Sequence, residues 1–276
     1  MAESNFMTPT EVAKALVDIG KKKAKLPIGE MLVLGILAGV YIGLASHLAT
    51  NISSGDWQIL GLKKFFAGAV FSVGLMLVVI PGSELFTGNN LMSVALFNRQ
   101  IGFGGLFRNW LIVYVGNLIG AVLLALMIAK GTGLLDGPVG SSAIKLAYAR
   151  VAATASDGLN HNWNYFFRAI GCNVLVCLAV MMAISAKDIG SKLMAMFFPI
   201  MAFVASGFEH CVANMYFLPA GIWAKMFDKA VVAGSSSLPY KEAIALSPAD
   251  LHAQAEVARQ TMAGLNWGTM WTQNLI

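Results

Sequence analysis

The chain contains apolar runs long enough to cross a lipid bilayer, and two of these runs are broken by the same short pattern. A membrane-spanning helix needs about 20 mostly apolar residues. Five spans are predicted on this basis, over about residues 31–50, 65–97, 109–130, 166–186 and 192–225. The second and the fifth are too long and too interrupted to be plain helices, so these interruptions constrain the fold more than any other feature.

Hydrophobic residues make up 57% of the chain and charged residues only 12%. A soluble domain carries about 25% charged residues. The balance therefore predicts an all-α integral membrane protein. The net charge of +5 is not arranged as a basic stripe with interleaved aromatic residues, so we expect no nucleic-acid partner.

The stretch "GSELFTGNN" interrupts the second span, and "GFEHCVANM" interrupts the fifth. Aligning Glu84 with Glu209 also aligns Asn89 with Asn214. Because the two spans are three apart, the halves of the chain run in opposite directions through the membrane. This pattern predicts an inverted repeat of three plus three helices, in which the broken helices mark a transport site.

Ionisable residues at membrane depth are costly and usually functional. We expect each glutamate to accept hydrogen bonds from the freed N–H groups of its own loop, and each asparagine to cap or clamp the end of that loop. His210 has no counterpart in the repeat, since Leu85 occupies the matching position. The sequence therefore favours His210 as the residue that lines the pore.

The polar N-terminus predicts a short amphipathic helix and a basic segment over residues 1–26, starting at Thr8-Pro9-Thr10-Glu11. Four lysines in Lys21–Lys25 precede the first span, and the positive-inside rule then places this end in the cytoplasm. Lys63 and Lys64 disagree, since they would lie outside.

The remainder, residues 27–276, is expected to be one transmembrane channel domain. In this topology residues 131–162 and 226–264 are external. A further apolar stretch starts near residues 265–276, but about 12 residues cannot cross a bilayer, so we expect the sixth helix to be absent from this chain.

Three cysteines, Cys172, Cys177 and Cys211, all fall inside apolar segments, which argues against a disulfide framework. A metal site or a membrane enzyme built on Glu209, His210 and Cys211 is disfavoured, because three consecutive residues do not converge easily on one ion. We expect no cofactor, no metal and no catalytic residue.

The motifs "GSELFTGN", "GCNVLVCLAV" and "FVASGFEHCVANM", with weaker support from "VGNLIGA", resemble the formate/nitrite transporter family over nearly the whole chain. The resemblance implies a homopentamer of six-helix protomers with an aquaporin-like fold and one pore in each protomer. It also implies transport of small monovalent anions such as formate, nitrite or hydrosulfide.

By this resemblance His210 is the central pore histidine, Thr87 is its hydrogen-bonding partner and Asn173 lies near both. The resemblance also supplies two apolar constrictions, which are Leu75, Leu85 and Phe86 on the cytoplasmic side and Phe71 and Phe203 on the periplasmic side. Arg150 falls where the family has a lysine that attracts anions, and Lys145 is the alternative.

These residues predict a pH-dependent anion channel in the plasma (inner) membrane, with formate as first choice and nitrite or hydrosulfide as alternatives. We expect the anion to cross as its neutral acid or paired with the imidazolium of His210, with proton co-transfer. The partners are then small anions, protons, lipid and other copies of the chain. A neutral-solute channel is less favoured, because the chain contains no Asn-Pro-Ala loop.

Overall fold

The computed structural model describes residues 6–151, 159–235 and 240–273, without the side chains of residues 159–162, 272 and 273. In this part of the chain the regular structure is helical, and the sole strand-like contact is an isolated bridge between Phe6 and Ala186. The prediction of an all-α protein is confirmed.

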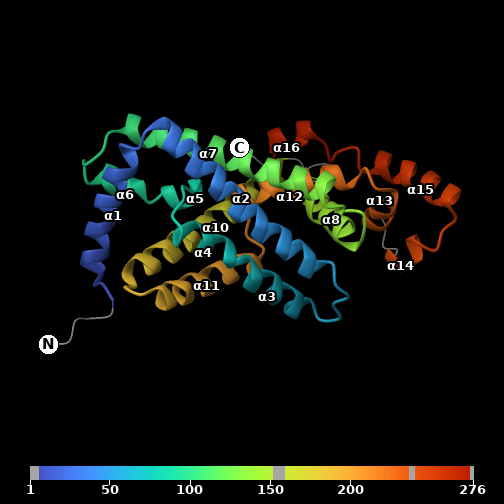
Figure 1. The fold of residues 1–276 in the computed structure, drawn as a ribbon, viewed down its shortest axis with the longest axis horizontal. Helices are drawn as coiled ribbons and strands as arrows, with labels where there is room; N and C mark the ends of the chain where they lie inside the picture. Colours follow the sequence, from blue (N-terminus) through green and yellow to red (C-terminus); the bar gives the residue numbers. More distant parts are fainter. Residues whose placement is uncertain (1–5, 152–158, 236–239, 274–276) are drawn as a thin grey trace.

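The first half of the chain begins with a surface helix and contains one interrupted span (Figure 1). Its helices are α1 (Pro9–Ala24), α2 (Ile28–Ser53), α3 (Leu60–Phe71), α4 (Val73–Val79), α5 (Phe86–Asn89), α6 (Met92–Phe97) and α7 (Phe103–Leu126), which continues as a π-helical turn over Met127–Gly131.

The second half repeats this order, again with a leading helix and an interrupted span. Its helices are α8 (Pro138–Val151), α10 (Leu159–Ser185), α11 (Ile189–Ser206), α12 (Cys211–Ala224), α13 (Asp228–Ser235), α14 (Tyr240–Ala243), α15 (Pro248–Thr261) and α16 (Trp267–Gln273).

Within the described residues, 5 segments are long and apolar enough to cross a membrane. They are Ile28–Ser53, Leu60–Val79, Phe103–Gly131, Trp163–Ser185 and Ile189–Ser206. The shorter apolar helix α12 completes the second interrupted span. The predicted interruptions lie where expected, between α4 and α5 and between α11 and α12.

Helices α2 and α7 cross at very short range because glycines line the contact. A Cβ atom added to Gly39 would lie 2.1 Å from the backbone oxygen of Asn117, and one added to Gly120 would lie 2.0 Å from that of Ile36. Small residues of this kind let membrane helices approach closely. This contact fixes Asn117 beside the first interruption.

The segment 131–162, which the sequence predicts to be external, contains a helix that packs against the rest of the protein. Helix α8 lies against α12 and α13 (Figure 1), and half of its residues are buried. Gly221 of α12 makes this packing possible, since a Cβ atom there would lie 2.3 Å from the Cβ of Ala147.

The surface helices lie at opposite ends of the bundle, with α1 and α6 at one end and α13, α14 and α15 at the other (Figure 1). The predicted start of α1 is confirmed, since Thr8 and Glu11 form a reciprocal capping box with Pro9 in the first turn. Residues 267–273, inside the predicted start of a sixth span, form α16.

Candidate transport pore

The first interruption separates α4 from the single turn α5. Gly82 adopts a positive φ of 87°, which favours glycine because it has no Cβ. The chain then runs extended through Leu85 into α5, which carries Thr87 and Asn89. This geometry places buried polar groups where a continuous helix would present only apolar side chains.

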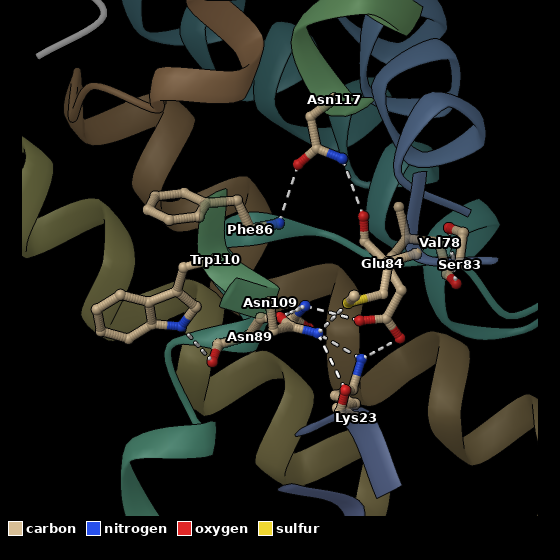
Figure 2. Close-up of polar contacts among 10 residues, drawn as sticks. Lys23, Val78, Ser83, Glu84, Phe86, Asn89, Asn109, Trp110 and Asn117 are labelled. Atoms are coloured by element: carbon tan, nitrogen blue, oxygen red, sulfur yellow. Dashed lines mark hydrogen bonds and ion pairs between the residues drawn. The ribbon is translucent and has the colours of Figure 1, made fainter. Parts of the chain in front are cut away.

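A cation from the surface helix holds this interruption (Figure 2). The ammonium group of Lys23 contacts Glu84 Oε1 at 2.6 Å and donates to Asn89 Oδ1 at 2.9 Å. Asn89 Nδ2 donates to Glu84 Oε2 at 2.7 Å. We call Lys23, Glu84 and Asn89 the first clamp. It ties the end of α1 to both sides of the break.

Asn117 of α7 holds the same interruption from the other side (Figure 2). Its side-chain oxygen accepts the N–H of Phe86 at 2.9 Å. Its Nδ2 donates to the backbone oxygens of Gly35 at 2.8 Å and Glu84 at 2.9 Å. Backbone groups freed by the break are therefore satisfied by protein, as buried non-helical backbone requires.

The second interruption lies between α11 and α12. Gly207 ends α11 in the left-handed conformation, with φ 78°. His210 is the N-cap of α12, and its Nδ1 accepts the backbone N–H of Ala213 at 3.1 Å. The imidazole therefore replaces the hydroxyl or carboxylate oxygen that usually caps a helix.

A second clamp, Arg150, Glu209 and Asn214, holds this interruption. Arg150 Nε lies 3.2 Å from Glu209 Oε2 and donates to Asn214 Oδ1 at 2.8 Å. Asn214 Nδ2 donates to Glu209 Oε2 at 3.1 Å. The guanidinium also lies 4.6 Å from the centre of the Phe217 ring.

The clamps correct one expectation and extend the repeat. The carboxylates of Glu84 and Glu209 bind an asparagine amide and a distant cation, and in the described residues no N–H of their own loops is recorded as their donor. Lys23 was missed by sequence reasoning, which treated it only as a topology signal. One signal was available, since Lys23 precedes Glu84 by 61 residues and Arg150 precedes Glu209 by 59.

The two interruptions meet at a buried polar pair. His210 Nε2 lies 3.0 Å from Thr87 Oγ1, and both residues are 4% exposed. Because Nδ1 accepts the Ala213 N–H, the neutral ring carries its proton on Nε2, which donates to Thr87. The structure thus brings together the histidine and the threonine that the resemblance pairs.

His210 of this pair borders a small chamber of about 10 Å³, which is space for about one water-sized molecule. Apart from His210, the chamber walls are apolar. They consist of Ile42, Phe71, Leu75, Leu85, Val176, Ile200 and Phe203.

Aromatic rings cover the histidine on one side of the chamber. The Phe203 ring stacks on the imidazole with a centroid distance of 5.7 Å. The Phe71 ring meets Phe203 edge-on at 5.6 Å and the imidazole at 6.5 Å. His210 and both of these rings also border the cavity that Arg150 borders.

Two larger cavities flank the chamber. The first, of about 460 Å³, is bordered by α1 and by the first clamp residues, and we call it the α1-side vestibule. The second, of about 280 Å³, is bordered by Arg150 of α8 and by Glu209 and Asn214, and we call it the α8-side vestibule. Leu75 and Leu85 border both the chamber and the α1-side vestibule, whereas Phe71 and Phe203 border both the chamber and the α8-side vestibule.

Four of the predicted site residues border none of the three cavities, and Thr87 is one of them. The Phe86 ring packs edge-on against Trp110 and Tyr114 and borders none of the three cavities. Asn173 faces Cys177, with 3.7 Å between Nδ2 and Sγ, and its buried Oδ1 has no partner in the structure. Lys145 is exposed on α8, outside the cavity linings.

Two helices interrupted at matching positions, with a buried polar pair between two vestibules, define a multi-pass membrane channel or transporter. The chain belongs to the formate/nitrite transporter family, whose sequence model matches residues 10–276. The relatives found in the comparisons are transporters and channels, so the family is not one of enzymes.

Among curated relatives, the chain is 43% identical over 242 residues to a probable formate transporter of Methanothermobacter thermautotrophicus, covering 81% of this chain and 88% of that protein. It is 38% identical to the formate channel FocA of Haemophilus influenzae, covering 80% of this chain and 77% of that protein.

Solved structures give the same result. A pentameric formate channel with formate bound is 30% identical, with a TM-score of 0.71 over 90% of this chain and 88% of that one. A formate/nitrite transporter family ion channel is 27% identical, with a TM-score of 0.69 over 96% and 97% of the two chains.

Proposed function

We propose that this chain forms a channel for small monovalent anions, with formate as the substrate and nitrite or hydrosulfide as the alternatives within the family. The observation that carries the proposal is His210, the one polar residue among the described residues that border an otherwise apolar chamber, together with its buried hydrogen-bond partner Thr87. The relatives named as formate channels, and the related structure that holds formate, support the choice of substrate.

The chamber favours a neutral species at the narrowest point. A bare anion among Phe71, Phe203 and Leu75 would lose its hydration without a compensating charge, which is very costly. Protonation to formic acid removes most of this cost. Flux should therefore rise as the pH falls, because a larger fraction of the formate is then protonated to formic acid.

The geometry at His210 favours a hydrogen-bond donor over a proton relay. Protonating Nδ1 would displace the N–H of Ala213 and uncap α12. The neutral ring keeps this cap and still presents Nε2–H to the substrate. In our proposal Nε2–H and the Thr87 hydroxyl orient the substrate in the chamber, and the substrate's own proton accounts for the pH response.

A neutral-solute channel is the second candidate, since the chamber is uncharged. The two lysines that border the α8-side vestibule, Lys63 and Lys64, favour anions instead. A swelling assay with glycerol in proteoliposomes separates the two, because an anion channel of this size admits formate and excludes glycerol.

Radiolabelled formate uptake into proteoliposomes tests the proposal, with nitrite, hydrosulfide and lactate measured in parallel at acidic and neutral pH. His210→Phe should abolish uptake, because it removes both the donor and the cap. His210→Asn should retain pH-dependent uptake, because an asparagine can cap the helix and donate from Nδ2. Loss of the pH response in His210→Asn alone would instead identify His210 as the titrating group.

We further propose a homopentamer in the plasma membrane with α1 on the cytoplasmic side. The related pentameric channel supports the assembly, and the lysines in residues 21–25 support the orientation. Crosslinking in native membranes tests the first, and protease accessibility of an N-terminal tag tests the second.

A further inference from the structure

The sequence assigned anion attraction to Arg150, but the structure gives Arg150 a different task. Its guanidinium contacts Glu209 and Asn214, donates to the backbone oxygen of Leu146 at 2.6 Å, and faces the ring of Phe217. A cation that is paired with a carboxylate at 3.2 Å projects little net charge into the vestibule. The same holds for Lys23, which is paired with Glu84 across the molecule.

With the two clamps set aside, the walls of the vestibules differ in charge. The remaining charged residues that border the α1-side vestibule are Lys22 and Glu30, whose opposite charges cancel. Those that border the α8-side vestibule are Lys63 and Lys64, whose positive charges add. Neither of these lysines makes an ion pair or a side-chain hydrogen bond with any residue that the structure describes.

The lysine pair does not lie where its charges would stabilise the fold. Lys63 and Lys64 lie near the start of α3, where the helix dipole is positive and favours acidic residues over basic ones. The first turn of α3 contains no acidic residue that would neutralise them. They also lie on the side of the membrane that the positive-inside rule depletes of lysine, if α1 is cytoplasmic.

We propose that Lys63 and Lys64 collect the anionic substrate at the α8-side vestibule, while Arg150 serves as a structural clamp. The inference rests on the proposed anion-channel function. The two ammonium groups and the N-terminus of α3 together raise the local concentration of small anions beside Phe71 and Phe203.

The test is the apparent KM for formate entering from the α8 side, in proteoliposomes of known orientation. Lys63→Gln/Lys64→Gln should raise this KM about fivefold at about 0.01 M salt, the effect of two unit charges acting across roughly 8 Å of water. At about 1 M potassium gluconate the difference should vanish, because the Debye length falls to about 3 Å. The maximal flux, and the KM from the α1 side, should not change.

The matched control is Lys229→Gln/Lys241→Gln, which removes the same two charges from exposed positions on α13 and α14, outside the vestibule lining. It should leave the KM unchanged, and Lys63→Arg/Lys64→Arg should behave as wild type. An unchanged KM in Lys63→Gln/Lys64→Gln overturns the inference, as does a change that persists at high salt. Absence of anion flux in the wild type overturns the proposed function instead.

Discussion

The two interruptions are held by the same kind of clamp, but different side chains satisfy their backbone groups. In both, a glutamate and an asparagine bind a cation from the end of a leading helix. At the first, Asn117 satisfies the loop backbone, and α5 has no side-chain cap. At the second, the His210 side chain caps α12 and also reaches the other interruption through Thr87. The shared clamp holds both interruptions, whereas His210, which has no counterpart at the first, borders the chamber.

Breaking the clamps gives the largest expected effect. Removing one partner of a buried ion pair leaves the other charge uncompensated and costs about 3 kcal/mol or more. Lys23→Ala should destabilise the protein more than Arg150→Ala, because the side chain of Glu84 is 8% exposed and that of Glu209 14%. Thermal unfolding in detergent measures this, with Lys23→Arg as the charge-preserving control. Negligible losses in both variants would show that the clamps are not structural, and equal losses would show that the difference in burial does not matter.

Asn117 distinguishes the first interruption from the second. Asn117→Ala should destabilise the protein by about 2 kcal/mol, because the Phe86 N–H and two carbonyl oxygens lose their partner in a buried site. Hydrogen exchange should accelerate at the Phe86 amide and not at the Ala213 amide. Exchange that accelerates equally at both amides would mean that the two interruptions do not open separately.

The helix cap at the second interruption should contribute less to the stability of the protein than the clamps or Asn117. His210→Ala removes the acceptor for the Ala213 N–H and should cost about 1 kcal/mol, whereas His210→Asn should restore most of this stability. Thermal unfolding of both variants, compared with their formate uptake, separates the cap from the donor. If His210→Asn is as unstable as His210→Ala, the cap contributes nothing.

The smallest effect on stability is expected far from both interruptions, in α13 and α15, which occur only at the α8 side. Burial of the Asp228 carboxyl raises its pKa, but hydrogen bonds from Arg259 and His252 outweigh this and hold the pKa below its usual range. A lowered folded-state pKa stabilises the protein above the unfolded value of about 3.9, and this is lost as the pH falls through the folded value.

Asp228→Asn should therefore lower stability slightly at neutral pH and flatten the acidic end of a stability–pH curve. A salt dependence of the wild-type curve should disappear in the variant, since the ion pair with Arg259 lies near the surface. If the acidic end of the stability–pH curve is unchanged in Asp228→Asn, other carboxylates cause the loss of stability at low pH.

Much of the fold was predictable because membrane solvation imposes strict rules on sequence. Span length, the two interruptions and the start of α1 at Thr8 follow from local patterns. The family followed from motifs that surround Glu84 and His210, and it is confirmed. The pore roles of individual residues remain predictions.

What could not be predicted depends on distant contacts. The lysine cluster had a sufficient explanation in topology, so nothing singled out Lys23 as the partner of Glu84. The burial of α8 depends on Gly221 meeting Ala147, a contact between helices that periodicity does not reveal. The ring of Phe86 turns toward Trp110 because Asn117 fixes its backbone N–H, and no local pattern encodes that rotation.

The hydrogen bond from the Ala213 amide to His210 Nδ1 also gives the protein a built-in spectroscopic reporter. Its proton and nitrogen chemical shifts depend directly on whether the imidazole nitrogen is free to accept. A labelled sample observed during a pH titration would show at one backbone resonance whether the ring keeps its tautomer, with no probe attached near the pore.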